Sequence, residues 1–385
     1  MPLTSRRPES LQDPDLRLFQ DSVRKFLGVH ATKEHVETWR KNKIIDRAFW
    51  ARAAEAGFLG LCVPEAYGGP GVDFRFDMAF VEELAAIGLE AFGGPMHNSV
   101  VAPYIVEFGD DAQKQRWLPG MVAGELIGAI AMTEPGAGSD LRGIRTTARR
   151  DGDHYVLNGQ KTYITNGQTA NLIAVVAKTG DDPTSGSVSL LFVETDQAAG
   201  FSRGRNLEKI GMDVADTSEL FFDNVAVPAS NLLGAEGAGL HQLMAKLPQE
   251  RLIIAVQGVA AIERALALTI DQVKQRSAFG QKIFEFQNTQ FTLAECKTEA
   301  TIARVFVDHC LNLHVRGDLD TTTAAMAKYW ITDLQCRVID ECLQLHGGAG
   351  YMLEYPIAQM YRDARAQRIY GGANEIMKML VARSL

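Results

Sequence analysis

The sequence predicts a mainly α protein with a β domain in its middle. Apolar residues recur at helical spacing through residues 1–129, which indicates an N-terminal helical domain. Short runs rich in β-branched and aromatic residues, separated by turn dipeptides, then indicate an antiparallel β domain over residues 130–238. Helical patterns return in residues 239–385 and include a run, 252–270, that is apolar on nearly all faces. Such a run is typical of a bundle interior, so a C-terminal four-helix bundle is predicted.

Length and composition limit the class of protein. The 385 residues suffice for two or three domains, and 46% hydrophobic with 22% charged residues is ordinary for a globular protein. The formal net charge of −8 opposes nucleic-acid binding, which requires a clustered basic surface. No charge-free run of about eighteen apolar residues is present, so no membrane span is expected. The stretch MPLTSRRPES leads into a polar amphipathic helix and not into a signal peptide's apolar segment. A soluble, cytoplasmic protein is therefore expected.

The cysteine and histidine patterns predict no metal site. The five cysteines lack CxxC spacing, and the eight histidines form neither HExxH nor a paired Cys/His pattern. Reduced and mostly buried side chains are expected at Cys62, Cys296, Cys310, Cys336 and Cys342.

Helix-start signals organise the N-terminal domain. Asp13, followed by Pro14 and an apolar series at helical spacing, predicts a capped amphipathic helix. A second helix is predicted to start at Asp46 and to end before Gly57. The segment VPEAYGGPG, residues 63–71, is predicted to be a connecting loop.

Turn dipeptides and strand-like runs divide the middle domain. Asp151-Gly152 and Asn158-Gly159 are typical of hairpin turns, and HYVL, NLIAVVAK, SVSLLFVE and SELFFDNVAV have the composition of strands. The polar segment DDPTSGS, residues 181–187, is predicted to be an exposed loop tip. Glycines are predicted to break the helices of the C-terminal domain at Gly280, Gly317 and the Gly347-Gly348 pair.

Residues 131–167 contain a candidate binding loop. Pro135, Gly136 and Gly138 forbid a helix, and the backbone donors of this loop are not hindered by bulky side chains. Such a loop can wrap an anion or a flat polar ring. A dinucleotide fold and a P-loop are both disfavoured, because no strand-glycine-helix order surrounds the loop and no lysine follows the glycines. Taken alone, the pattern favours an ordinary proline-glycine turn that leads into a sheet.

Motifs along nearly the whole chain resemble those of the acyl-CoA dehydrogenase family. TEPGAGSD and NGQKTYITNG, within residues 133–167, are similar to the flavin-binding signature of that family. Further similar pieces follow the family's order: VPEAYGGPG (63–71), GDDAQKQRWLPGMVAGE (109–125), FFDNVAVPASNLLG (221–234), RSAFGQKI (276–283), QLHGGAGY (344–351) and YRDARAQRIYGGANEI (361–376). So many pieces in one order are far more specific than any single motif. The resemblance implies the same three-domain layout, bound FAD, and oxidation of an acyl-CoA thioester to the trans-2-enoyl-CoA.

That reaction sets physical requirements for the site. The α-carbon of a thioester is a weak acid, so donors must stabilise the developing enolate and a carboxylate with a raised pKa must take the proton. The flavin accepts the β-hydride, which no amino-acid side chain can do. Most family members carry the base in a Tyr-Glu-Gly-Thr pattern, but in the matching segment, 369–375, the base position holds Gly371.

A second glutamate offers a replacement for the missing base. LPQERL, residues 247–252, resembles a segment of the long-chain and isovaleryl branches, in which a glutamate on the bundle helix reaches the same α-carbon. This resemblance places the base at Glu250. An arbitrary helix glutamate is usually solvated, but Glu250 directly precedes the apolar run. Gly371 would then contribute its backbone N–H to the thioester oxygen, together with the ribityl 2′-hydroxyl of the flavin.

The resemblance also implies the residues that contact cofactor and substrate. Family positions that line the isoalloxazine and the pyrophosphate match Ile130, Met132, Thr133, Gly138, Ser139, Tyr163 and Thr165. Positions that hold the pyrophosphate and adenosine, in part from a neighbouring subunit, match Arg276, Ala278, Phe279, Phe286, Gln287, Gln344, Gly348 and Glu375. Ala373 matches a flavin-binding position but replaces the usual threonine, so one flavin hydrogen bond of the relatives is expected to be missing. Positions near the pantetheine and acyl pocket match Ser139, Arg251, Tyr370 and Gly371. The charge of Arg276 also makes sense independently, because guanidinium pairs well with diphosphate.

The expected function is therefore that of an FAD-dependent acyl-CoA dehydrogenase. It would introduce a trans α,β double bond into long-chain or methyl-branched acyl-CoA thioesters, pass electrons to an electron-transferring flavoprotein, and assemble as a homotetramer. Two alternatives stay open at this stage. One is an oxygen-using relative, such as an acyl-CoA oxidase or flavin monooxygenase, and the other is a flavin-binding scaffold without catalysis.

Overall fold

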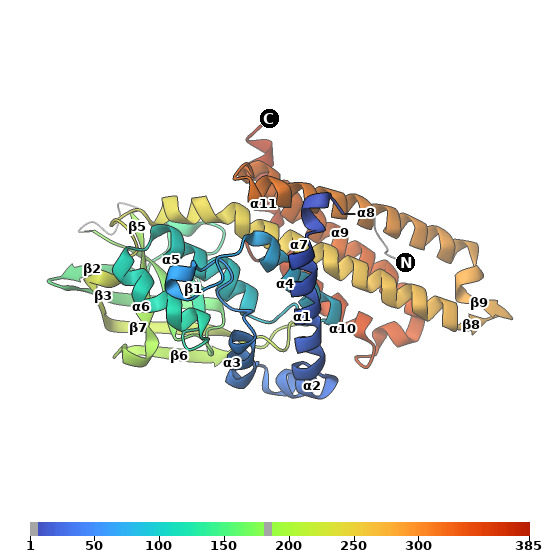
Figure 1. The fold of residues 1–385 in the computed structure, drawn as a ribbon, viewed down its shortest axis with the longest axis horizontal. Helices are drawn as coiled ribbons and strands as arrows, with labels where there is room; N and C mark the ends of the chain where they lie inside the picture. Colours follow the sequence, from blue (N-terminus) through green and yellow to red (C-terminus); the bar gives the residue numbers. More distant parts are fainter. Residues whose placement is uncertain (1–6, 181–186) are drawn as a thin grey trace.

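The computed structural model describes residues 7–180 and 187–385. The loop tip predicted at 181–187 lies outside these residues except for Ser187. The molecule is elongated, with the β domain at one end and the β8–β9 hairpin (Ser277–Ala278 and Gln281–Lys282) at the other, as Figure 1 shows. The long helix α7 (Gly239–Gln275) runs between the two ends.

Capped helices form the N-terminal domain. They are α1 (Pro14–His30), α2 (Lys33–Asn42), α3 (Arg47–Glu55), α4 (Phe74–Ile87), α5 (Ala102–Phe108) and α6 (Asp111–Val122). The carboxylates of Asp13 and Asp46 accept hydrogen bonds from Asp15 and Phe49 backbone N–H groups, which confirms both predicted helix starts. Helix α2 was not predicted, because it is polar and buries only Trp39, so it has no apolar stripe.

The middle domain is a seven-stranded sheet, mainly antiparallel as predicted. Its strands are β1 (Gly128–Ala131), β2 (Thr147–Asp151), β3 (His154–Thr165), β4 (Leu172–Lys178), β5 (Val188–Glu194), β6 (Phe201–Asn206) and β7 (Thr217–Pro228). Their order is β1-β4-β2-β3-β7-β6, with β5 paired to β4. The exception to the antiparallel arrangement is β4, which is parallel to β1 and, at one residue pair, to β2.

The two predicted hairpin turns have different outcomes. Asp151 pairs with His154 across a two-residue turn, so the first is confirmed. The turn at Asn158-Gly159 is wrong, because both residues lie inside β3. Gly159 has φ +150° and sits at a register shift of the β3–β7 pairing, and a Cβ there would lie 2.4 Å from Thr146 Oγ1. The glycine is thus required by close packing inside the sheet.

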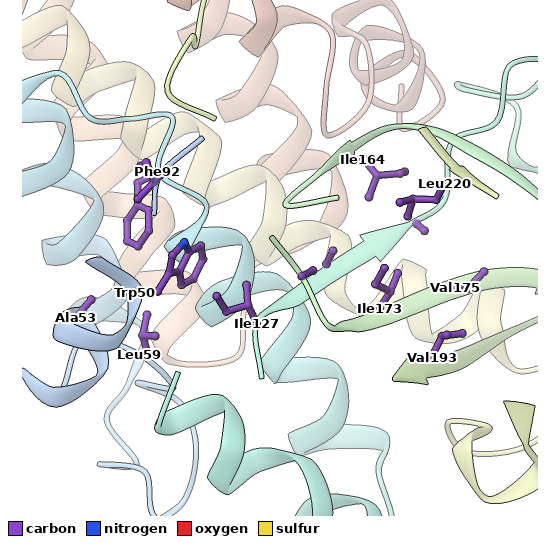
Figure 2. Packing of buried hydrophobic residues seen from close by; sticks show 14 of the residues in the cluster. Trp50, Ala53, Leu59, Phe92, Ile127, Ile164, Ile173, Val175, Val193 and Leu220 are labelled. Atoms are coloured by element: carbon purple, nitrogen blue, oxygen red, sulfur yellow. The ribbon is translucent and has the colours of Figure 1, made fainter. Parts of the chain in front are cut away.

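The N-terminal helices and the sheet share one hydrophobic core. Figure 2 shows Trp50, Leu59 and Phe92 of the helical side near Ile127, which directly precedes β1, with Ile173 of β4 farther along the same core. All five side chains are nearly completely buried. The two domains are therefore packed as one body, which fixes the end of β1 relative to the helices.

The C-terminal domain packs α8 (Gln287–Val315) and α9 (Thr321–His346) against α7, with the short helices α10 (Pro356–Ala364) and α11 (Asn374–Ala382) against α9. Helices end before Gly280, Gly317 and the Gly347-Gly348 pair, as predicted. Buried charges connect this domain to α4, since Arg304 Nη2 lies 2.7 Å from Glu263 Oε2 and Arg304 Nη1 lies 2.5 Å from Glu82 Oε1.

Helix α7 qualifies the expectation that no segment could span a membrane. Within the part of the chain that the structure describes, it alone has the length and hydropathy to do so, with a window of mean hydropathy 1.7. Of that window, 67% is buried inside the protein, which is typical of the core helix of a bundle.

Candidate active site

Glu250 is a buried acid on the inner face of α7. Its side chain is only 7% exposed, and Tyr104 Oη donates a hydrogen bond of 2.9 Å to its Oε1. Burial raises the pKa of Glu250, and the opposing effects of the Tyr104 hydrogen bond and of Arg251 and Lys246 do not cancel that rise. A carboxylate with a raised pKa inside a closed site has the properties of a general base.

Tyr104 is a site residue that sequence reasoning missed. It lies on α5, directly after a π-helical turn η3 (Met96–Val101), and is completely buried. Gln249 Nε2 donates to the Ser99 carbonyl oxygen at 2.7 Å, so the turn is tied to α7 one residue before Glu250. Such π-turns occur often at functional sites, because they re-aim the residues that follow.

Replacing Tyr104 by Phe is expected to lower activity most at acidic pH. The lost hydrogen bond stabilises the charged carboxylate, and such bonds contribute about 1.5–3 kcal/mol. The pKa of Glu250 should therefore rise further, the acid limb of kcat/KM should move to higher pH, and activity at pH 6 should fall by about tenfold.

The matched control is Tyr155→Phe, which removes a buried phenol that donates to Glu236 Oε2 at 2.8 Å in the β domain. Its pH profile of kcat/KM should superimpose on that of the parent. Equal acid limbs for Tyr104→Phe and the parent would show that the phenol does not act on the base.

The loop that carries Gly371 faces α7 one helical turn beyond Glu250. Gly371 has φ +64°, and a Cβ there would lie 2.3 Å from Cδ1 of Ile254. The backbone N–H of Gly371 donates to no residue in the described parts of the chain. The Tyr370 hydroxyl makes a long contact of 3.5 Å with Gln257 Oε1, also on α7. The structure thus brings Glu250 and a free N–H donor to the same stretch of α7, as their predicted roles require.

Arg251 is a buried guanidinium with unsatisfied N–H donors in the described ranges. It is 4% exposed, and within residues 7–180 and 187–385 its Nε and Nη1 atoms have no hydrogen-bond acceptor. Burial lowers the pKa of Arg251, and the carboxylate of Glu250 only partly opposes that effect. Because an unpaired buried charge is strongly unfavourable, a bound ligand is expected to supply the acceptor. This fits its predicted place near the substrate.

The candidate flavin loop leaves several of its donors free, although the N–H groups of Glu134 and Ala137 donate to each other's carbonyl oxygens. Backbone N–H groups of Thr133, Gly138 and Ser139 bond to no residue that the structure describes. The carbonyl oxygens of Met132 and Thr133, by contrast, accept bonds from Lys161 Nζ at 3.1 Å and from Thr162 N at 2.9 Å. A loop with occupied acceptors and unoccupied donors suits a polar ring edge and a pyrophosphate.

A buried ion pair holds this loop in place. Lys161 Nζ lies 2.8 Å from Glu134 Oε1, and the same carboxylate accepts from the backbone N–H groups of Arg145 and Thr146. Burial lowers the pKa of Lys161 to about 8, which the bond to Glu134 partly opposes. Neither Glu134 nor Lys161 was predicted from the sequence as part of the site.

The predicted cofactor residues form two separate groups. The first surrounds the end of β1 and the end of β3, and consists of Ile130, Met132, Thr133, Gly138, Ser139, Tyr163 and Thr165. Tyr163 is exposed and has φ +59°, an unusual backbone conformation that is often found at ligand sites. Ala373 and Glu375 lie at the start of α11, close to Gly371.

The second group lies at the far end of the bundle. It contains Arg276, Ala278, Phe279, Phe286 and Gln287, with Gln344 and Gly348 at the end of α9. Arg276 follows Glu250 by 26 residues, or about 39 Å at 1.5 Å per residue. The second group therefore lies far along α7 from the proposed base.

The chain has two helical domains that flank a β domain. Its candidate site combines a loop with free backbone donors and a buried carboxylate near a free N–H. These features together are those of a three-domain flavoprotein oxidoreductase. Family models match in succession: acyl-CoA dehydrogenase, N-terminal domain, at residues 13–125; middle domain, at 129–225; and C-terminal domain, at 237–385. The chain belongs to the acyl-CoA dehydrogenase family.

Relatives and solved structures agree with this assignment. The mitochondrial long-chain specific acyl-CoA dehydrogenase of Mus musculus is 47% identical over 370 residues, which are 96% of this chain and 86% of that protein. The mitochondrial isovaleryl-CoA dehydrogenase of Pongo abelii is 34% identical over 375 residues, which are 96% and 88% of the two chains. The crystal structure of acyl-CoA dehydrogenase from Geobacillus kaustophilus is 49% identical with a TM-score of 0.94, covering 97% of this chain and 98% of that one.

FAD is the cofactor of this family. Acyl-CoA dehydrogenase from Bacillus anthracis, whose crystal structure is complexed with FAD, is 30% identical with a TM-score of 0.91, covering 97% of this chain and 68% of that one. The protein is thus an FAD-dependent oxidoreductase that dehydrogenates acyl-CoA thioesters, and the similarities do not support the oxygen-using or non-catalytic alternatives. Within the described ranges, no group of three or more His, Cys, Asp or Glu is placed to hold a metal ion.

Proposed function

We propose that Glu250 abstracts the α-proton of the acyl-CoA thioester while the backbone N–H of Gly371 binds the thioester oxygen. The observation that carries this proposal is that a buried carboxylate on α7 and a loop with an unbonded N–H, which faces the next turn of that helix at Ile254, come together. The α-proton passes to the Glu250 carboxylate, and the charge that develops on the thioester oxygen is met by the N–H donor. When bound, FAD supplies the acceptor for the β-hydride, and a trans α,β double bond results.

The proposed substrates are long-chain or methyl-branched acyl-CoA thioesters. The similar proteins include dehydrogenases named for long-chain acyl-CoA and for isovaleryl-CoA. In this chain the proposed base lies on α7. The loop has glycines at 371 and 372, so no loop side chain takes the place of that base. The substrate proposal therefore rests on the similar proteins and on the position of the proposed base on α7.

We further propose that the protein works as a homotetramer and reduces an electron-transferring flavoprotein. The support for assembly is the position of the second cofactor group, which lies at the end of the molecule opposite the β domain. Phe279, at the tip of the β8–β9 hairpin, is 97% exposed and has φ +52°. An exposed aromatic side chain on a strained backbone is expected to contact a ligand or a second copy of the chain. The five free cysteines support a reducing, cytoplasmic location.

Anaerobic titration of the purified protein with acyl-CoAs tests the proposed function. We expect bound flavin to be bleached by straight chains of long length and by methyl-branched chains, with at least about tenfold differences in rate across the panel. A matched set of free fatty acids, which lack an acidifying thioester, should not bleach the flavin. A yellow protein that no acyl-CoA reduces would contradict the proposal.

A further inference from the structure

Lys328 is a buried cation beneath the loop that carries Gly371. It lies on α9, its side chain is completely buried, and its ammonium donates to the Gly372 carbonyl oxygen at 2.7 Å and to Asn374 Oδ1 at 2.8 Å. We propose that Lys328 is a positioning residue that holds the Gly371–Gly372 loop so that the Gly371 N–H faces the thioester oxygen. This inference rests on the proposed function.

The loop needs such an anchor because it has little else to fix it. Gly371 and Gly372 both have positive φ, +64° and +94°, and glycines in this region have no side chain that could lock them by packing. A backbone of this kind samples many conformations unless its polar groups are held. The Lys328 ammonium holds the carbonyl of the second glycine from the side of α9.

Asn374 extends the anchor to the start of α11. Its Nδ2 donates to Thr332 Oγ1 at 2.9 Å, to Asp333 Oδ1 at 2.9 Å and to the Tyr329 carbonyl oxygen at 3.2 Å, all on α9. The residue that follows the loop is thus fixed to the helix that bears Lys328. On its other side the loop meets α7, through Gly371 at Ile254 and Tyr370 at Gln257. The Gly371 N–H donor therefore lies between the contacts of the loop with α9 and those with α7.

The charge of Lys328 also affects an oxygen that is bound at the loop. Burial lowers the pKa of Lys328 to about 8, while Asp333 and Glu375 oppose this effect and Arg251 and Arg368 add to it. Arg368 is itself paired with Asp333, whereas Arg251 has unsatisfied N–H donors in the described ranges. Lys328 therefore lies against the loop, and a second buried cation, Arg251, is near enough for their charges to interact. Their field favours negative charge on an oxygen bound there, as a preorganised oxyanion site requires.

The test compares Lys328→Met and Lys328→Gln with the parent holoenzyme. Met removes both hydrogen bonds of the Lys328 ammonium and has a side chain of similar length. Gln is shorter and keeps an uncharged N–H donor. Lys209→Met is the matched control, since Lys209 Nζ donates to the Ala215 carbonyl oxygen in the β domain, away from the site. FAD content, thermal melting, kcat and KM are measured for each, together with the absorbance of bound cinnamoyl-CoA, whose spectrum moves to longer wavelength when its carbonyl oxygen is polarised.

We expect kcat to fall by about tenfold in Lys328→Met and by less in Lys328→Gln, with little change in KM or FAD content. The red shift of bound cinnamoyl-CoA should shrink in the same order, and Lys209→Met should match the parent. Parent values of kcat and of the red shift in both FAD-loaded variants would overturn the inference, as would loss of folding or of FAD in both. Failure of the proposed function itself would differ, because the parent would then neither be bleached by acyl-CoA nor shift the probe.

Discussion

Replacing Glu250 by Gln should lower the rate of flavin reduction by acyl-CoA at least about a thousandfold and leave FAD bound. Positioned general bases contribute about 10²–10⁴-fold, and the water that could replace this one is excluded from a site in which the side chain is buried. Gln has nearly the same shape and can still accept the hydrogen bond of Tyr104 through its carbonyl oxygen. The fold and the flavin loop, which Glu250 does not touch, should therefore persist.

Two measurements separate loss of the base from other defects. Anaerobic bleaching reports the whole reaction, whereas exchange of the α-proton into deuterated water reports the proton step alone, and both should be lost together. Glu263→Gln is the matched control, because Glu263 lies on the same helix but pairs with Arg304 away from the site. Full activity of Glu250→Gln would show that the base lies elsewhere.

The proposed base at Glu250 came from the resemblance to the family together with two local signals, and its catalytic role stays a prediction. The glycine at 371 marks an absent carboxylate, and Glu250 directly precedes the apolar run that α7 buries. The helix starts at Asp13 and Asp46 could be predicted because a capping side chain bonds to the backbone of its own first turn.

What the sequence could not predict depends on contacts between distant segments. Tyr104 and Glu250 are 146 positions apart, and nothing in PYIVEF distinguishes the tyrosine from its apolar neighbours. The buried position of Lys328 could have been considered from the sequence. A lone lysine within the helical run AAMAKYWI must either reach solvent or find buried acceptors. Asn158-Gly159 has the chemistry of a turn, but the approach of Thr146 to Gly159 and the pairing with β7 keep both residues inside a strand.

A carboxylate restored to the loop should recover part of the activity that Glu250→Gln loses. The structure shows why Gly371→Glu alone would be obstructed, since a Cβ at 371 would lie 2.3 Å from Cδ1 of Ile254. Ile254→Val removes that methyl group at a stability cost of about 0.5–1.5 kcal/mol. A non-glycine residue at φ +64° costs about 1–2 kcal/mol more. The domain should tolerate both changes, and the triple variant Glu250→Gln, Gly371→Glu, Ile254→Val should bleach about a hundredfold faster than Glu250→Gln on straight chains.

The neighbouring glycine provides the control for this gain. A Cβ at Gly372 would point toward Met377 Cε, 2.5 Å away, and not toward α7. Gly372→Glu in the Glu250→Gln background therefore adds the same charge to the same loop without aiming it at the substrate, and it should recover nothing. Equal recovery by both variants would mean that any nearby carboxylate suffices. No recovery by the correctly folded, FAD-loaded triple variant would contradict the view that Glu250 and position 371 approach one α-carbon from two directions. Branched chains should benefit less than straight ones, because the new side chain adds bulk to the loop beside the acyl chain.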